Sequence, residues 1–270
     1  GLWRRKLGAS RTAMLFEREG AEVELGPTLR KLVTAARFNP RLPYLSFLCI
    51  NFDAPVVKEA ASWFLDGVFL NYNSSYLEQM LEQLLDEDDS PEVTRFLRAV
   101  DVRIDGFRVE RAPEWRGQRV FVRHEVGGKA YELRFSEESA GTQKLMGLAA
   151  YLMTALERGG TVVVDELDAK LHPKLLRYVI LLFKDPEVNK SGAQLIFSSQ
   201  DVSTMRNDVF RRDEIWFAAR GEGEASQLWS LADIHEANGN LVSKNAAFDK
   251  QYLSGRYGAD PYLTRIEEWD

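Results

Sequence analysis

Two adjacent carboxylates follow a short apolar segment in the middle of the chain. Residues 161–164, Thr-Val-Val-Val, predict a buried strand, and Asp165 and Glu166 come directly after it. Nucleoside triphosphate hydrolysis needs such a pair: the first carboxylate holds Mg²⁺, usually through water, and the second faces the other way and polarises the attacking water. Acids are also common where a strand ends at solvent, so the pair alone is a weak indication of this chemistry.

The elements around the acid pair predict a parallel sheet. Apolar strands alternate with helices over residues 141–158, 161–164, 174–184, 194–199, 203–210 and 214–219. This alternation is typical of parallel strands covered by helices on both faces of the sheet. Ligands of such sheets bind beyond the carboxyl ends of the strands. We therefore expect the chemistry to lie after Val164, after Ser199 and at the helix start near Gly141.

The start of that helix has the composition of an anion site. Ser139, Ala140, Gly141 and Thr142 are small, and they precede a helix whose first amides lack intrahelical partners. Small side chains let a phosphate approach those amides. The alternative is an ordinary serine N-cap followed by glycine, which is a common helix start. This segment is followed by a helix and then by the acid-bearing strand. That order along the chain favours the anion site.

The combined segments resemble ABC-type ATPases of the SMC, RecF and OLD group. Asp-Glu-x-x-x-x-Leu-His-Pro at residues 165–173 resembles the Walker B motif and D-loop, and residues 139–142 resemble the signature motif, with Thr142 at its glutamine position. Residues 194–201 resemble the strand that leads to the switch histidine, where this chain has Gln200. Glutamine still donates a hydrogen bond to a phosphate but does not carry a proton.

The end of the chain narrows the resemblance. Residues 210–217 and 252–261 resemble C-terminal signatures of AAA15-type ATPases, a group with members similar to abortive-infection and anti-phage defence proteins. The resemblance implies an α/β fold: an ABC-type P-loop NTPase head with a parallel-sheet core, flanking helices, a helical insertion and a small antiparallel β-hairpin region. For the Tyr-Leu-x-Gly-Arg-Tyr-Gly run within the second segment, a packed turn against the core is the plain interpretation.

The resemblance assigns roles to single residues. It implies ATP and Mg²⁺ as cofactors, with Asp165 at the metal and with Glu166 and Gln200 as catalytic residues. It implies nucleotide binding by Ser139, Ala140, Gly141, Thr142 and His172, on the surface that meets the ATP of a second protomer. His172 stands where the common pattern has aspartate, and its simpler role is to position the turn before Pro173.

One motif of the family is missing from the sequence. Gly-x-x-x-x-Gly-Lys-[Ser/Thr], the P-loop that cradles the α- and β-phosphates, occurs nowhere in the 270 residues. In the family it lies near the N-terminus, ahead of a helical insertion. We expect that the N-terminal Walker A lobe is absent from this chain; a degenerate ATPase that acts as a scaffold is the alternative.

The remaining sequence predicts two regions. Residues 1–100 have the pattern of a mostly helical insertion, with helices over 55–72 and 76–85. The acidic run 86–89 predicts a solvated loop, with a divalent-metal site as the alternative, and Ser90 is a candidate N-cap for a short helix through Phe96 and Leu97. Residues 101–270 form the C-terminal lobe of the ATPase core. Within that lobe, alternating runs on either side of Gly127-Gly128 predict a β-hairpin over 119–135. His124 lies in the hairpin without a second ligand nearby, which favours a packed or surface histidine.

Composition excludes several classes of protein. The net charge of −6 argues against a general nucleic-acid coat, although it leaves a local basic patch open. The single cysteine, Cys49, excludes an internal disulfide and lies in an apolar run typical of a core. No apolar run is long enough to span a bilayer, and no signal peptide is evident, so we predict a cytoplasmic protein without membrane contact.

Three functions compete at this stage. The first is an ATP-binding and ATP-hydrolysing switch in anti-phage (abortive-infection) defence, which forms a homodimer or higher oligomer through an ATP sandwich and controls an effector such as a nuclease or another toxin. The second is a non-hydrolysing scaffold, favoured by Gln200 and the missing P-loop and opposed by the intact acid pair. The third is a DNA-repair ATPase of the RecF or SMC sort, which predicts a basic surface or long heptad arms that the sequence lacks.

Overall fold

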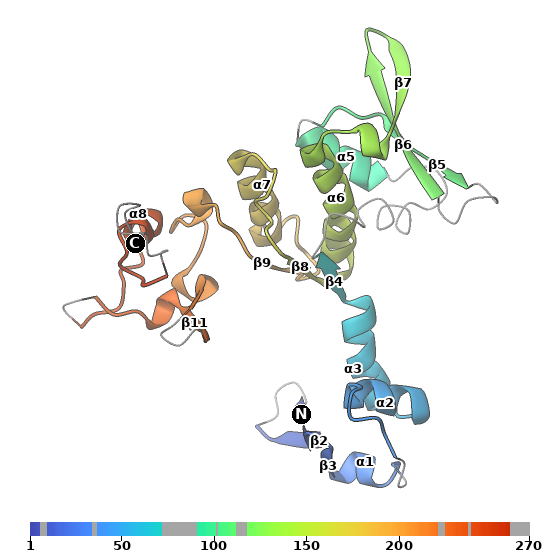
Figure 1. Cartoon of the computed structure of the whole chain (residues 1–270), viewed down its shortest axis with the longest axis vertical. Helices are drawn as coiled ribbons and strands as arrows, with labels where there is room; N and C mark the ends of the chain where they lie inside the picture. The colour runs from blue at the N-terminus through green and yellow to red at the C-terminus, as the bar shows by residue number, and fades with distance from the viewer. Residues whose placement is uncertain are drawn as a thin grey trace, which may run out of the picture. The chain divides into compact units, whose positions relative to one another are not determined.

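The computed structural model of the chain divides into two compact units, Gly1–Phe69 and Leu70–Asp270 (Figure 1). It describes residues 1–5, 10–33, 37–71, 91–100, 102–111, 118–220, 225–236 and 239–259. A separate hydrophobic cluster lies in each unit. Of the helices in these ranges, none is long and apolar enough to cross a membrane.

The first unit opens with an antiparallel sheet that the sequence did not predict. The three strands, in the order β1-β2-β3, are β1 (Leu2–Arg5), β2 (Thr12–Glu19) and β3 (Glu22–Leu25). The prediction that the start of the chain is mostly helical was therefore wrong for these residues. The pattern was misleading because β2 buries the adjacent residues Leu15 and Phe16, so no period-two alternation marks the strand.

Three helices complete the first unit: α1 (Pro27–Arg30), α2 (Tyr44–Asn51) and α3 (Pro55–Asp66). The chain enters α1 through Gly26, where any Cβ would lie only 1.8 Å from the carbonyl oxygen of Met14. Aromatic rings join the sheet to α2, since Phe16 and Tyr44 meet edge to face with their centroids 5.0 Å apart. The sheet and helices thus share one core, with Leu29 and Leu48 fully buried.

The helix predicted over residues 55–72 ends early. It stops at Asp66, Gly67 caps it by donating to the carbonyl oxygen of Trp63 at 3.1 Å, and β4 (Val68–Asn71) follows. The prediction extended past Gly67 because the apolar residues of β4 continue the helical spacing of α3. The predicted helix over 76–85, the acidic run 86–89 and the Ser90 cap lie outside the described residues, and α5 (Pro91–Ala99) forms as predicted.

The β-hairpin prediction is confirmed. β6 (Gln118–Val126) pairs antiparallel with β7 (Lys129–Arg134), and Gly127 and Gly128 between them have φ values of 60° and 74°. Two consecutive positive φ values match the tight hairpin turn that glycine favours. β5 (Gly106–Arg111) pairs with the other edge of β6, and the 3-10 helix η2 (Phe135–Glu137) then leads into α6.

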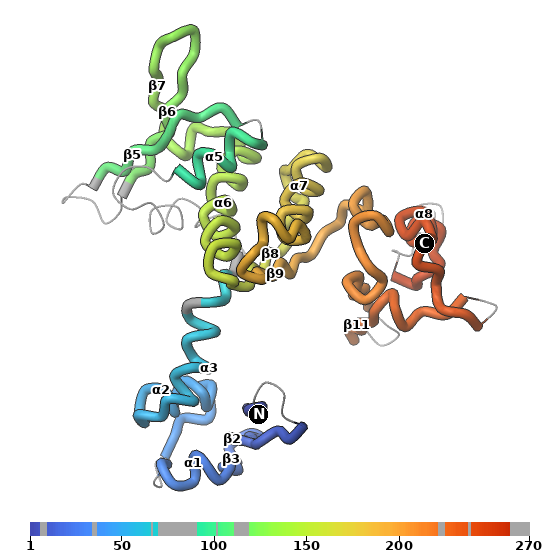
Figure 2. Tube along the Cα trace, turned by 180° about the vertical axis from the view of Figure 1, so that it is seen from behind, coloured from blue at the N-terminus to red at the C-terminus, as the bar shows by residue number. Residues whose placement is uncertain are grey.

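The acid-bearing strand lies in a parallel pair, as predicted. α6 (Ala140–Arg158), β8 (Thr161–Val164), α7 (Pro173–Lys184) and β9 (Gln194–Phe197) follow one another, and the sheet has the order β4-β8-β9. β8 and β9 run parallel, with Thr161 opposite Gln194 and Val164 opposite Phe197. Helix α6 packs against β8 and α7 against β9 (Figure 2). Four leucines at helical spacing on α6 are buried: Leu145, Leu148, Leu152 and Leu156.

Two expectations about this sheet were wrong. β9 is not a buried strand, since the side chain of Ile196 is 57% exposed. The third apolar strand, β10 (Trp216–Arg220), does not join the parallel sheet but pairs antiparallel with β11 (Ser226–Ser230) in a sheet of its own. The loop between β10 and β11 is short, so its closure costs little entropy and local pairing is favoured.

The region after β9 is less helical than predicted. Only η3 (Val202–Thr204) is helical within the helix expected over 203–210. Three further short elements follow, which are η4 (Arg212–Glu214), η5 (Leu231–Asp233) and α8 (Phe248–Leu253). Short turns with backbone hydrogen bonds, such as Val209 N–H and Phe210 N–H to the carbonyl oxygen of Arg206, take the place of the longer helix.

Aromatic side chains of the C-terminal segment pack together in a cluster. Phe217 of β10 stacks on Tyr252, with centroids 5.7 Å apart, and lies 5.3 Å from the ring of Tyr257. The hydroxyl of Tyr257 donates to Gln251 at 2.7 Å, and burial raises the pKa of Tyr257 to about 12. The Tyr-Leu-x-Gly-Arg-Tyr-Gly run is therefore a turn packed against this cluster, the plain interpretation of its sequence.

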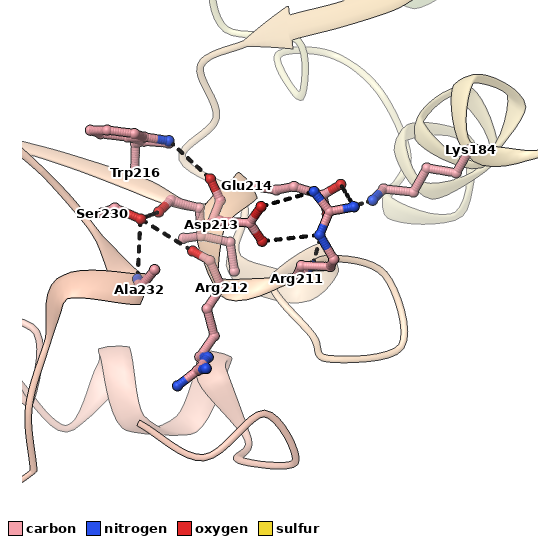
Figure 3. A network of polar contacts seen from close by, with 9 residues as sticks. Lys184, Arg211, Arg212, Asp213, Glu214, Trp216, Ser230 and Ala232 are labelled. Carbon is pink, nitrogen blue, oxygen red and sulfur yellow. Dashed lines mark hydrogen bonds and ion pairs between the residues drawn. The ribbon is translucent and has the colours of Figure 1, made fainter. Parts of the chain in front are cut away.

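Ion pairs join α7 to the segment that carries η4. Lys184 donates to the carboxylate of Glu214 at 2.6 Å, and Arg177 donates to Asp208 at 3.0 Å. Figure 3 shows Glu214 between Lys184 and Arg211, with Arg211 also paired to Asp213. These contacts anchor η4 on the helix that follows the acid pair.

Candidate functional site

Ser198 joins the acid pair to the end of β9. Its hydroxyl donates to Oδ1 of Asp165 at 2.5 Å and accepts from the backbone N–H of Glu166 at 2.8 Å. The backbone ladder continues on both sides, because Ser198 N–H donates to Val164 and Leu167 N–H donates to Ser198. The residues after β8 and after β9 are thus brought together, where the parallel-sheet argument placed them.

The acid pair opens a constrained turn. Glu166 and Lys170 have φ values of 49° and 64°, in the left-handed region that side-chain-bearing residues rarely adopt. Leu167, between them, is fully buried and anchors the turn. The amide of Ala169 donates to the carbonyl oxygen of Glu166 at 3.0 Å, and that of Leu171 to Asp168. Strain of this kind persists only where neighbouring contacts hold it, and it gathers at functional sites.

Gln200 is fixed through its backbone. Its N–H donates to both carboxylate oxygens of Asp168, each at 3.2 Å. The residue is exposed. The turn after the acid pair and the turn after β9 are therefore tied twice, at Ser198 and at Gln200.

The helix start predicted to bind an anion lies beside this turn. Ser139 is the N-cap of α6, and its hydroxyl accepts from the N–H of Thr142 at 3.1 Å. In the part of the chain that the structure describes, the amides of Ala140 and Gly141 have no hydrogen-bond acceptor. A Cβ on Gly141 would lie 2.8 Å from the carbonyl oxygen of Lys170, so glycine permits a close approach of the two segments.

Lys144 is a site residue that sequence reasoning missed. Lys144 lies one helical turn beyond Gly141. Its ammonium group donates to the backbone carbonyl oxygen of Glu166 at 2.5 Å. Burial lowers the pKa of Lys144, although the carboxylates of Asp168, Glu166 and Asp165 act in the opposite direction. The available signal was the position of a lone lysine three residues after Gly141, on the face that leads to the anion site.

The two histidines singled out from the sequence have structural partners. His172 is the N-cap of α7, where its Nδ1 accepts from the N–H of Lys174 at 3.1 Å. This is its simpler predicted role; contact with a second protomer's nucleotide stays a prediction. His124 is a packed histidine, as predicted, with Nε2 2.6 Å from Glu138 and Nδ1 2.9 Å from the carbonyl oxygen of Arg103.

The site residues fit part of a Mg²⁺–nucleotide site. Asp165 is exposed and, beside its contact with Ser198, offers a second carboxylate oxygen. Mg²⁺ keeps several waters and takes one or two carboxylates plus phosphate oxygens, so one exposed aspartate beside a hydroxyl suits it. Within the described ranges, no group of three His, Cys, Asp or Glu side chains forms a cage for a metal. The amides of α6 suit a phosphate.

The fold and the site define a class of protein. A parallel strand that ends in an acid pair, held against a neighbouring strand that ends in polar residues, is typical of P-loop ATPases. A family profile described as "AAA domain, putative AbiEii toxin, Type IV TA system" matches residues 36–206. The chain belongs to this AAA domain family, which is a P-loop ATPase family.

Other comparisons add little. A search of curated proteins found no match to the chain. A solved structure from work on ATP-driven dimerization and DNA-stimulated activation of SMC ATPases is 14% identical, with a TM-score of 0.33, over 58% of this chain and 81% of the other.

Proposed function

We propose that this protein is an ATP-binding and ATP-hydrolysing subunit of the ABC type, of the AAA15 group, that serves as a nucleotide-controlled switch in anti-phage defence. The observation that supports it best is the Ser198 contact with both residues of the acid pair. Ser198 holds one oxygen of the Asp165 carboxylate, so that Asp165 would hold Mg²⁺ through its other oxygen, and it also holds the backbone that carries the Glu166 side chain. Glu166 would then polarise the attacking water, and the exposed Gln200 would contact the γ-phosphate.

The openness of the site supports an ATP sandwich between two protomers. Asp165, Glu166 and Gln200 are all exposed, as are Ser139 and His172 on the neighbouring segments. Phosphoryl transfer proceeds in a site from which bulk water is excluded. A second protomer would cover these residues, so that Ser139, Ala140, Gly141 and Thr142 meet the γ-phosphate of its ATP.

An effector partner belongs to the proposal. The family description names a toxin and a toxin–antitoxin system, and a switch in such a setting acts on another protein. The net charge of −6 makes nucleic acid a weaker choice of partner than a protein effector such as a nuclease.

A second candidate is a binding-only switch or scaffold. The residue at the switch position is Gln200, which donates hydrogen bonds but does not transfer a proton. In that version ATP joins the protomers, and the release of ATP rather than its hydrolysis parts them.

ATP turnover tests the proposal. Because the 270 residues hold no P-loop motif, turnover is measured on the protein expressed from its whole gene. We expect Glu166→Gln to reduce kcat by about a hundredfold or more and to retain bound ATP, because the water loses its polarising carboxylate. Glu187→Gln, the same change at an exposed position on the loop after α7, should leave kcat unchanged.

Each result has a distinct meaning. Equal kcat in the native protein and the Glu166→Gln variant would remove Glu166 from the mechanism. Tight ATP binding without turnover in the native protein would favour the binding-only switch. If the native protein showed no ATP binding and no ATP turnover, the assignment of this site to ATP would be overturned.

A further inference from the structure

Lys144 makes a contact that the proposed reaction does not use. It extends from the first turns of α6 to the backbone of Glu166, 22 residues later in the chain, and its ammonium group donates to that carbonyl oxygen at 2.5 Å. The Lys144 side chain is half-buried. Burial of a charged lysine is unfavourable unless it gains hydrogen-bond partners, and the Glu166 carbonyl oxygen supplies one.

The Glu166 carbonyl oxygen is held from two directions. It accepts from the Lys144 ammonium and also from the N–H of Ala169 at 3.0 Å. The N–H of the same residue donates to Ser198. Every polar group of the Glu166 backbone is therefore engaged, and its φ of 49° is the conformation these bonds maintain. The Glu166 side chain is left exposed, in a direction that this backbone sets.

The same helix turn also contacts the far end of the acid-pair turn. Gly141 lies against the carbonyl oxygen of Lys170, the other residue with a positive φ. The charged groups facing Lys144 are Asp165, Glu166 and Asp168, with Lys170 opposing them. The start of α6 thus touches the turn at its first and last strained residues.

We propose that Lys144 is a positioning residue that couples the start of α6 to Glu166 within one chain. This inference rests on the proposed function, because the consequence concerns the reaction. A phosphate bound at the amides of Ala140 and Gly141 would shift the start of α6. Because Lys144 contacts the Glu166 carbonyl oxygen, that shift would move the Glu166 backbone. Engagement of α6 by one nucleotide would then set the direction of the Glu166 carboxylate that acts on another.

Substitutions of Lys144 separate this role from a purely structural one. Lys144→Met keeps the length of the apolar stem but removes the donor, whereas Lys144→Arg keeps a donor. In the whole-gene protein we expect Lys144→Met to lower kcat about tenfold or more with KM for ATP within about twofold of native, because only the orientation of Glu166 changes. Lys144→Arg should recover a large part of kcat. Lys174→Met, at an exposed position in α7, is the matched control.

A measurement that needs no turnover tests the contact itself. Amide hydrogen exchange over residues 166–169 without nucleotide should rise about tenfold in Lys144→Met and stay near native in Lys144→Arg. Unchanged exchange and unchanged kcat in Lys144→Met would overturn the inference, and so would equal losses in both variants. If the native protein lacks turnover, the proposed function fails while the exchange result still decides whether Lys144 holds Glu166.

Discussion

A single hydroxyl organises the acid pair at the residue scale. Ser198 donates to Asp165 and accepts from Glu166, so the two carboxylates have a common reference point on the neighbouring strand. Sequence reasoning identified both carboxylates, because two acids after an apolar strand form a local pattern. It assigned no role to Ser198, which lies 33 residues beyond Asp165.

Removal of this hydroxyl should affect catalysis more than folding. We expect Ser198→Ala to lower kcat by about tenfold, because Asp165 loses its donor and the Glu166 amide its acceptor, at a net loss of about 1 kcal/mol per hydrogen bond. Ser203→Ala, at an exposed position in η3, is the control. Steady-state kinetics and thermal melts of both variants decide the point, and native kcat in Ser198→Ala would contradict it.

The switch position can be tested by restoring the family residue. Gln200→His supplies a group able to carry a proton, while the backbone contact of residue 200 with Asp168 is kept. We expect kcat to rise if this position limits turnover. An unchanged kcat, measured at saturating ATP, would mean that another step is limiting.

At the scale of elements, α6 and the acid-pair turn form one unit because glycine allows their backbones to meet. We expect Gly141→Ala to lower kcat, since its new Cβ would press on the carbonyl oxygen of Lys170 from 2.8 Å. Alanine usually stabilises a helix relative to glycine, by up to about 1 kcal/mol. A lower melting temperature in this variant would therefore identify the close approach as its cause, whereas a stabilised, fully active variant would refute it.

The attachment of η4 to α7 should depend on pH. Burial tends to raise the pKa of Glu214, but hydrogen bonds from Lys184 and the Arg211 amide outweigh it and hold the pKa below its ordinary 4.5. The stabilisation is therefore present above pH 4.5 and is lost as the pH falls through the lowered value.

Glu214→Gln tests this dependence. We expect the variant to be less stable than native by about 1 kcal/mol at pH 7, with the difference shrinking below pH 4.5. Denaturant titrations across pH measure it, with Glu157→Gln at an exposed position of α6 as the control. A difference that stays constant with pH would exclude the ion pair as its source.

At the scale of the whole molecule, the proposed sandwich predicts complementation between inactive variants. Gly141→Asp should block the signature surface by repelling the γ-phosphate, and Glu166→Gln should block the acid pair. In a mixed dimer one composite site keeps both native residues. Random pairing with one working site in two sets an upper limit of about a quarter of native turnover for an equimolar mixture. The working site takes its Glu166 from the Gly141→Asp chain, so the coupling through Lys144 should hold the recovered turnover below that limit but above the turnover of either variant alone. Turnover no higher than that of the separate variants, despite mixed dimers shown by mass spectrometry, would argue against the sandwich.

The sequence by itself determined the local features of this protein. Periodicity and turn chemistry predicted α6, β8, α7, the β6–β7 hairpin and the position of Asp165 and Glu166, because each depends on residues close together in the chain. Only the tertiary structure decided that β10 pairs with β11 instead of joining the parallel sheet, and that residues 2–25 form strands. It also decided that Ser198 and Lys144 meet the acid pair. Those outcomes depend on contacts between distant residues, whose free energy of packing and hydrogen bonding no local pattern contains.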